Sequence, residues 1–187
     1  MTEAIQSMDF SILHAIQQNM RCDLLDFLMP KISIIASAGI IWIALAVVLL
    51  LMKKHRVCGI KMLAGLLSGL LIGNGLLKNV IARPRPSWLD PTVILLVANP
   101  RDFSFPSGHT LSSFISATIL FRHDKRFGIP AFVLATIIAF SRLYLYVHFP
   151  TDVIAGALLG ILIGILADIL LQRTVIDRRA AKNENKK

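Results

Sequence analysis

Five long apolar stretches constrain this chain more than any other feature of its sequence. They occupy residues 32–52, 57–77, 108–121, 129–147 and 153–171. A helix that crosses a bilayer needs about 20 mostly apolar residues. The stretch at 108–121 is short, unless residues 103–107 extend it into the interface. Because 55% of all residues are hydrophobic, too many for a soluble domain of this size, we predict an all-α polytopic transmembrane bundle with five full spans.

The N-terminal segment has a different character. Its apolar residues recur near helical spacing on both sides of Arg21, which predicts two short interfacial helices within residues 1–31. The alternative is a sixth, short span at residues 24–37 that breaks at Gly39. Internal repeats and low-complexity linkers are absent from the sequence. Residues 1–187 are therefore predicted to form one domain, with the bundle at 32–171 and a basic tail at 172–187.

The net charge of +9 is compatible with a nucleic-acid-binding protein, but its distribution favours a membrane protein. Lysine and arginine concentrate in two short connections, at 53–56 and 122–126, and in the tail. Basic loops of this kind stay in the cytoplasm, and with five spans all three clusters fall on that side. Basic tails also attract anionic lipid head groups. The sequence thus predicts bilayer lipids as partners, no nucleic acid, and a cytoplasmic C-terminus.

Three polar segments lie at span ends on the opposite side of the predicted bundle. They are KNVIARPRP at 78–86, PSGH at 106–109 and SRLYLYVHFPTD at 141–152. The first segment ends its helix at two prolines, the second opens a span, and the third connects two spans. We therefore expect these segments to meet at one face of the membrane, although they are far apart in the sequence.

The cations and the helix start in these segments suit a phosphate. Lys78, Arg85 and Arg142 can place three positive charges together, and the two arginines can bind phosphate oxygens in a bidentate manner. Ser107 lies where a helix N-cap belongs, and Gly108 lets the backbone approach a ligand closely. Free N–H groups at a helix start bind anions. This pattern predicts a site for a multiply charged oxyanion.

Two histidines add chemistry to the predicted anion site. Asp152 follows His148 by four positions, so its carboxylate can reach back to the Nδ1–H group and leave Nε2 free to attack phosphorus. His109 can supply a proton to the leaving oxygen. The sequence contains no Cys/His cluster with zinc spacing and no acidic cluster that suits magnesium. No metal or other cofactor is therefore predicted.

Together the three segments resemble the signatures of the type 2 phosphatidic acid phosphatase superfamily. The matching patterns are Lys78-x6-Arg85-Pro86, Pro106-Ser107-Gly108-His109 and Ser141-Arg142-x5-His148-x3-Asp152. The resemblance implies a metal-independent phosphohydrolase with a phosphohistidine intermediate. It further implies that His148 is the nucleophile, Asp152 its partner and His109 the general acid. The residues implied to hold the phosphate are Lys78, Arg85, Ser107, Gly108 and Arg142.

Three charged residues near these motifs match no motif position. We expect Arg83 to extend to the interface along its apolar stem, and Arg101 and Asp102 to belong to a solvated loop.

The predicted function is removal of a phosphate from a lipid-linked diphosphate. Small bacterial members of the superfamily resemble undecaprenyl-diphosphate phosphatases, which recycle a cell-wall lipid carrier, so undecaprenyl diphosphate is the expected substrate. The expected location is the bacterial inner membrane, with the site on the extracytoplasmic face. Phosphatidylglycerophosphate, phosphatidic acid and lipid A 1-phosphate stay open as substrates. From other classes, a vanadate-dependent haloperoxidase and a non-catalytic binder or transporter stay open as well.

Overall fold

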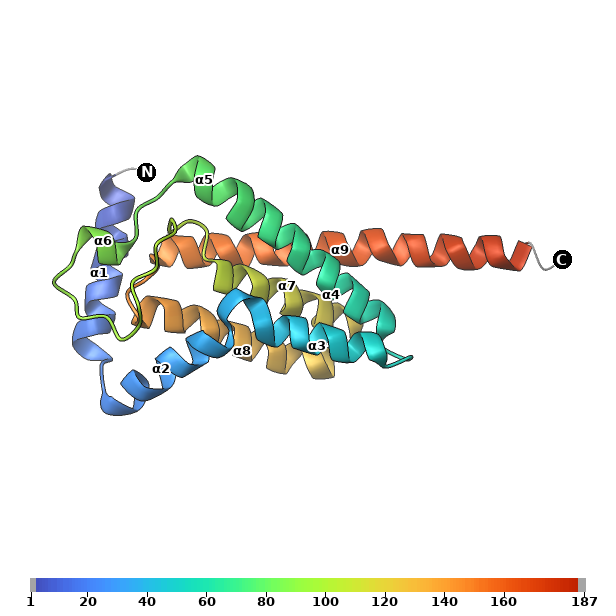
Figure 1. Cartoon of the computed structure of the whole chain (residues 1–187), viewed down its shortest axis with the longest axis horizontal. Coiled ribbons are helices and arrows are strands. Elements are labelled where there is room, and N and C mark those ends of the chain that lie inside the picture. The colour runs from blue at the N-terminus through green and yellow to red at the C-terminus, as the bar shows by residue number, and fades with distance from the viewer. Residues whose placement is uncertain (1–2, 185–187) are drawn as a thin grey trace.

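A computed structural model describes the backbone of residues 3–184 and the side chains of residues 3–172, and every regular element in that part is helical (Figure 1). The elements in chain order are α1 (Glu3–Asn19), α2 (Asp23–Ile35), η1 (Ser37–Gly39), α3 (Ile40–Leu51), α4 (Arg56–Gly69), η2 (Leu70–Leu77), α5 (Lys78–Ile81), α6 (Pro86–Leu89), α7 (Gly108–His123), α8 (Lys125–Tyr144) and α9 (Pro150–Glu184). The backbone of α9 continues through most of the predicted tail. The tail side chains beyond residue 172 lie outside the described residues.

Helix α7 is the centre of the bundle, packed between α4, α8 and α9. Its neighbour α9 approaches closely because it carries glycines at every fourth position. A Cβ atom added at Gly156 would lie 2.9 Å from the carbonyl oxygen of Ser107, and one at Gly160 would lie 2.8 Å from that of Leu111. Small residues at this spacing are a common means of close helix packing in membranes.

The number of crossings differs from the sequence prediction. Within the described residues, three segments are long and apolar enough to cross a bilayer, namely Arg56–Leu89, Lys125–Tyr144 and Pro150–Gln172. A fourth is the bent pair formed by α2 and η1–α3, which meet at 44°. Helix α7 has 16 residues, about 24 Å at 1.5 Å per residue, which is shorter than the hydrocarbon core of about 30 Å. The prediction of five full spans is therefore not confirmed.

The N-terminal segment forms two helices, as predicted, but with a different end. Helix α2 continues through Pro30 to Ile35, and the chain bends where Ala38 and Gly39 take left-handed backbone angles, with φ of 52° and 71°. In Figure 1, α2 and α3 lie one after the other along the bundle, with the bend between them. Because the two helices together make at most one candidate span, the alternative of a separate sixth span at 24–37 is not confirmed either.

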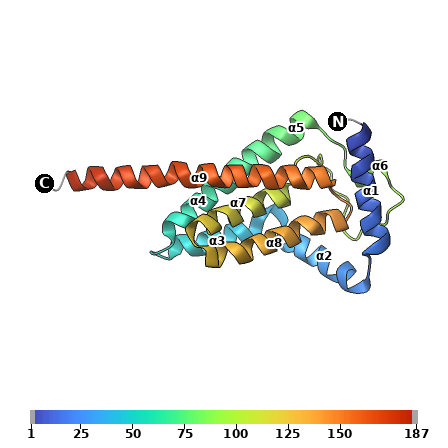
Figure 2. The ribbon, with the colours of Figure 1, turned by 180° about the vertical axis from the view of Figure 1, so that it is seen from behind.

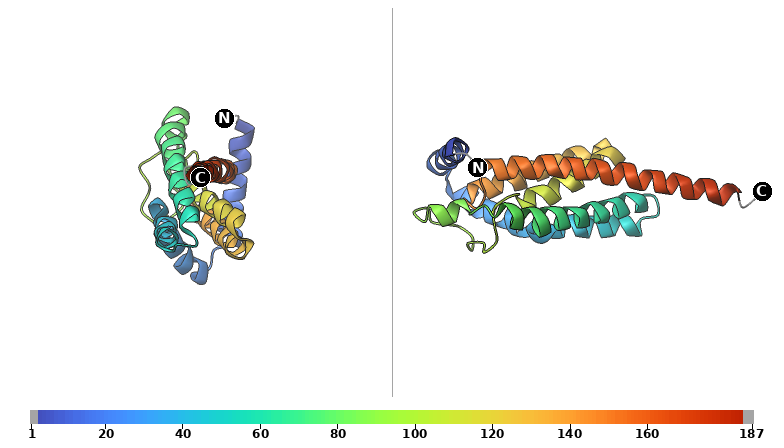
Figure 3. Two further views of the ribbon diagram at one scale, coloured as in Figure 1. Left: turned by 90° about the vertical axis from the view of Figure 1, so that its right-hand side faces the viewer. Right: turned by 90° about the horizontal axis from the view of Figure 1, so that it is seen from above.

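Helix α1 runs across the long axis of the bundle and lies at the end opposite the C-terminus (Figures 1 and 2). It packs against α8 and α9, and the end-on view of Figure 3 shows it passing beside α9. The connections that precede α4 and α8 lie at the other end of the bundle, where α9 runs on toward the C-terminus (Figure 1). The basic connections and the three polar segments are thus separated by the length of the bundle.

Candidate active site

The fold brings the three polar segments together at the end of the bundle that α1 covers. A cavity of about 900 Å³ opens there. The sequence-predicted residues that line it are Lys78, Arg85, Gly108, His109, Arg142 and His148. Two predicted residues, Ser107 and Asp152, are fully buried but do not line the cavity. They lie behind the residues that do.

His148 and Asp152 lie side by side, but they do not form a direct hydrogen bond. The distance between His148 Nδ1 and Asp152 Oδ2 is 3.6 Å, which exceeds hydrogen-bond range. Asp152 Oδ2 accepts hydrogen bonds from the Ser104 hydroxyl and from the Phe149 backbone N–H group, the latter at 2.9 Å. The Ser104 hydroxyl also lies 3.5 Å from His148 Nδ1. A shift of a few tenths of an ångström would close the predicted contact.

The surroundings of His148 favour the neutral imidazole. The ring is buried, and its Nε2 atom lies 3.2 Å from Arg85 Nη1. Burial lowers the pKa of His148 to about 3. The positive charges of Arg85 and Arg142 act in the same direction, and Asp152 opposes them. At neutral pH the ring therefore carries one lone pair, which a nucleophile requires.

The Asp102 carboxylate pairs with two of the three cations that line the cavity. Its Oδ1 atom accepts from Arg85 Nη2 at 2.7 Å, and its Oδ2 atom accepts from Lys78 Nζ. The Asp102 side chain is 56% exposed. Burial opposes ionisation of this carboxyl, but Lys78 and Arg85 outweigh that effect and lower its pKa to about 2. Asp102 thus lies in an exposed loop, as expected, but its carboxylate also contacts the predicted phosphate site, which the sequence did not indicate.

Arg142 and His109 both contact Ser33 of α2. Arg142 Nη1 donates to the Ser33 hydroxyl, and His109 Nε2 lies 3.2 Å from the Ser33 carbonyl oxygen. Among the described residues, Arg142 Nε is buried without a hydrogen-bond partner. A buried guanidinium N–H group at the cavity, with no protein acceptor, is suited to an anionic ligand.

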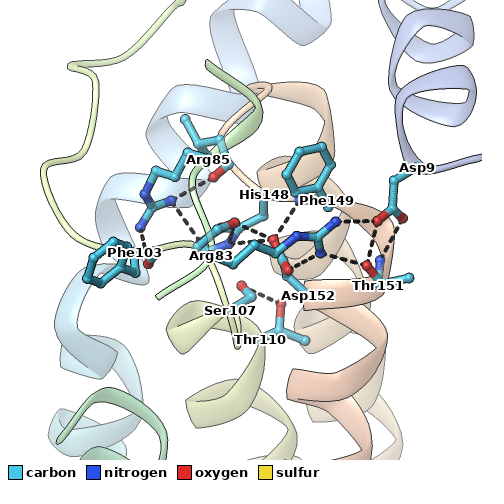
Figure 4. Close-up of polar contacts among 12 residues, drawn as sticks. Asp9, Arg83, Arg85, Phe103, Ser107, Thr110, His148, Phe149, Thr151 and Asp152 are labelled. Carbon is cyan, nitrogen blue, oxygen red and sulfur yellow. Dashed lines mark hydrogen bonds and ion pairs between the residues drawn. The ribbon is translucent and has the colours of Figure 1, made fainter. Parts of the chain in front are cut away.

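The start of α7 contributes its backbone rather than the serine side chain. Ser107 is the N-cap residue, but its hydroxyl accepts a hydrogen bond from the Thr110 hydroxyl at 3.0 Å (Figure 4), and the residue does not line the cavity. Gly108 lines the cavity beside Asn74 of η2, where an added Cβ would lie 3.0 Å from the Asn74 Oδ1 atom. A phosphate contact through the Ser107 side chain stays a prediction.

Arg83 is buried, with 6% of its surface exposed, so the expectation that it extends to the interface is wrong. It donates to Asp152 and to Asp9 of α1 (Figure 4). Sequence reasoning also missed Ser33 and Ser104. Ser33 lies 76 positions before His109 and 109 before Arg142, and no spacing rule connects residues so far apart, because only the fold brings α2 to this end of the bundle.

Among the described residues, no group of three or more His, Cys, Asp or Glu side chains could hold a metal ion. The cavity lining also contains the cations Lys78, Arg85 and Arg142, which bind anions.

The fold and the site define a class of protein: an all-helical membrane protein with a cationic, histidine-containing cavity at one end of its bundle. Residues 56–175 match the PAP2 superfamily, and the chain belongs to that family. The resemblance inferred from the three motifs is thereby confirmed, and the chain is an integral membrane protein.

Two relatives of the chain are named as undecaprenyl-diphosphatases. An undecaprenyl-diphosphatase from Sulfolobus acidocaldarius is 37% identical over 129 residues, which cover 68% of this chain and 62% of that protein. The undecaprenyl-diphosphatase BcrC of Bacillus subtilis is 35% identical over 116 residues, which cover 61% of this chain and 56% of that protein. The matched region thus spans less than two thirds of the length of either relative.

Two solved structures share the fold over most of its length. A transmembrane PAP2-type phosphatidylglycerolphosphate phosphatase from Bacillus subtilis superposes with a TM-score of 0.77 at 30% identity, covering 92% of this chain and 88% of that chain. LpxE of Aquifex aeolicus superposes with a TM-score of 0.75 at 30% identity, covering 86% of this chain and 94% of that chain.

Proposed function

We propose that this protein is a lipid phosphatase that hydrolyses undecaprenyl diphosphate to undecaprenyl phosphate, and that the whole chain acts as one domain. The observation that carries the proposal is the shape of the cavity. Its polar end holds Lys78, Arg85, Arg142 and both histidines, and the same cavity continues between apolar side chains of α3, α4 and η2. A substrate with a phosphate head and a long apolar tail matches both parts.

The apolar part of the cavity reaches the outer surface of the bundle. Its lining includes Ile43 of α3, Leu67 of α4 and Leu70 of η2, which are 42%, 57% and 55% exposed. In a bilayer these side chains face acyl chains, because the helices that carry them belong to candidate spans. A polyprenyl chain can therefore lie between α3 and α4 while its diphosphate occupies the polar end.

The proposed reaction uses the residues at the polar end. Nε2 of neutral His148 attacks the terminal phosphorus and forms a phosphohistidine, while the bond from phosphorus to the bridging oxygen breaks. Arg85, Arg142 and Lys78 stabilise the charge on the phosphoryl oxygens. His109 donates a proton to the departing oxygen and then accepts one from the water that hydrolyses the intermediate. Asp152 orients His148 and stabilises its positive charge.

We also propose that α7 crosses the membrane with the four longer segments. Helices α3, α4, α7, α8 and α9 run in alternating directions between the two ends of the bundle (Figure 1). Helix α7 is surrounded by protein, so hydrophobic mismatch with the lipid constrains its length less than that of its neighbours. Five crossings place the basic connections and the C-terminus in the cytoplasm. The site then faces the extracytoplasmic side of the inner membrane.

Other lipid phosphates are the main alternative substrates. Relatives include a phosphatidylglycerophosphatase B from Bacillus subtilis, 36% identical over 115 residues, and a lipid A 4′-phosphatase from Bacteroides thetaiotaomicron, 32% identical over 94 residues. Both names describe phosphatases that act on other lipid phosphates.

Phosphate release from purified protein tests the proposal. The substrates are undecaprenyl diphosphate, phosphatidylglycerophosphate, phosphatidic acid and lipid A 1-phosphate, each assayed with EDTA and with His148→Ala as the control. We expect release from undecaprenyl diphosphate to be fastest, to survive EDTA and to be inhibited by vanadate, which mimics five-coordinate phosphorus.

Faster turnover of a monophosphate lipid would replace the proposed substrate. Loss of activity in EDTA that magnesium restores would contradict the metal-independent mechanism. Halide oxidation with peroxide, without phosphate release, would favour the haloperoxidase alternative.

A further inference from the structure

Asp9 is a fully buried carboxylate in a helix that carries no part of the three motifs. It lies on α1 with 0% of its surface exposed, and it precedes the matched family region at residues 56–175. Its Oδ1 atom accepts from the Thr151 backbone N–H group at 3.1 Å, and its Oδ2 atom accepts from the Thr151 hydroxyl at 2.6 Å. A buried charge is costly unless it is paired, so a partner of opposite charge is required.

Arg83 is that partner, and it connects Asp9 with the catalytic end of the bundle. Its Nη2 atom donates to Asp9 Oδ2 at 2.7 Å, and its Nη1 atom donates to Asp152 Oδ1 at 2.5 Å (Figure 4). The guanidinium also lies over the Phe149 ring, 3.9 Å from its centroid. Arg83 does not line the cavity. Its contacts therefore support the residues behind the phosphate site and not the phosphate itself.

The two carboxylate oxygens of Asp152 consequently face different residues, Arg83 and His148. Oδ1 accepts from Arg83, whereas Oδ2 is the carboxylate oxygen that faces His148 Nδ1, at 3.6 Å. An arginine paired with Asp152 alone would form a neutral, bidentate ion pair and draw both oxygens away from His148. Asp9 engages the other side of the guanidinium. The group Asp9, Arg83 and Asp152 keeps a net charge of −1, which can stabilise a positive charge on His148.

We propose that Asp9 and Arg83 are positioning residues for the reaction, so that the N-terminal helix α1 is part of the catalytic unit. They hold Asp152 with one oxygen directed at His148 and preserve the negative charge that a phosphohistidine requires. This inference rests on the proposed function, in which His148 is the nucleophile. It gives a role in catalysis to the N-terminal segment, which contains none of the three motifs.

The informative variant is Asp9→Asn, which keeps the size and shape of the side chain and removes its charge. We expect kcat to fall roughly 10- to 100-fold, because small displacements of catalytic groups have effects of that size. The KM and the inhibition by inorganic phosphate should change less than about twofold, because Lys78, Arg85 and Arg142 are not displaced. Arg83→Lys, which keeps the charge but lacks the planar fork that bridges two carboxylates, should lower kcat in the same way.

A double-mutant cycle separates positioning from a general effect on folding. If Asp9 acts through Asp152, Asp9→Asn should lower kcat strongly in the wild-type background and less than about twofold in the Asp152→Asn background. A general loss of folded protein would reduce kcat by the same factor in both backgrounds. The same cycle is run with Arg83→Lys, so that the test stands if Asp9→Asn folds poorly.

The matched control is Asp26→Asn. Asp26 anchors the same N-terminal segment by accepting from the Tyr144 hydroxyl at 2.5 Å and from Arg21 at 3.3 Å, but it contacts neither Arg83 nor Asp152. We expect nearly wild-type kcat for this variant. Equal losses from Asp9→Asn in the two backgrounds, or unchanged kcat for both Asp9→Asn and Arg83→Lys, would overturn the inference alone. A wild-type protein that releases no phosphate from any of the four lipids, or an active His148→Ala variant, would instead overturn the proposed function.

Discussion

The Asp102 carboxylate accepts a hydrogen bond from the Arg85 guanidinium at 2.7 Å, at the position where the sequence predicts a substrate phosphate. A carboxylate and a phosphoryl group compete for the same N–H donors, so a bound phosphate must displace Asp102 or share Arg85 with it. Because the Asp102 side chain is 56% exposed, its displacement into solvent is feasible.

The first prediction concerns this competition. Asp102→Asn removes the charge that pairs with Lys78 and Arg85, and an exposed ion pair contributes up to about 1 kcal/mol. We expect the KM to fall up to about fivefold and inorganic phosphate to inhibit more strongly, with kcat changed less than about twofold. Steady-state kinetics with one lipid substrate measure all three quantities. A higher KM would show that Asp102 helps to bind the substrate and does not compete with it.

The second prediction separates the two histidines. His148→Ala should abolish hydrolysis of every substrate, because no phosphohistidine can form. His109→Ala should lower the rate by roughly 10²–10⁴-fold for a monophosphate lipid, whose alkoxide leaving group needs a proton. The loss should be smaller for a diphosphate lipid, because phosphate leaves more easily. Asp152→Asn should fall between the two. Residual activity in His148→Ala and none in His109→Ala would reverse the assignment of the two roles.

The third prediction concerns stability and pH. Burial lowers the pKa of His148 from 6.5 to about 3, so below about pH 6.5 the unfolded chain binds a proton that the folded protein does not. Stability should therefore fall as the pH decreases from 6.5 toward 3. Between pH 6.5 and 5 the contribution is up to about 2 kcal/mol. Thermal unfolding in detergent should show a smaller loss of Tm over this interval for His148→Gln than for the wild type. Equal losses would mean that His148 is solvated in the folded state.

The fourth prediction concerns topology. A cysteine at position 90 should react with an impermeant thiol reagent on intact cells, and a cysteine at position 54 should not, because basic connections stay in the cytoplasm. The native Cys22 is exposed and Cys58 is buried. The experiment therefore starts from a Cys22→Ser background, in which Cys58 is the remaining native thiol. Labelling at position 54 alone would place the site in the cytoplasm and contradict the proposed role in lipid-carrier recycling.

The sequence by itself determined the class of fold and the convergence of the motifs. Long apolar stretches must be helices in a bilayer, because their backbones have no other hydrogen-bond partners there. Short connections make successive helices antiparallel. Lys78, His109 and His148 lie at alternate span ends, so they had to meet at one face. Six of the eight predicted site residues line one cavity, and the other two lie directly behind it.

Only the tertiary structure decided which charges are buried and what they contact. Arg83 has the sequence environment of an interfacial arginine, but its partner Asp9 is 74 positions away, and no local pattern reports such a distant pair. Asp102 lies in a segment whose sequence predicts an exposed loop, but the course of that loop brings its carboxylate to Arg85. The short apolar stretch of α7 is visible in the sequence, but only the structure shows that other helices surround it. Helices α4, α8 and α9 take the place of lipid around α7. The energy of a buried charged side chain likewise depends on the residues that surround it in the fold and not on its position in the sequence.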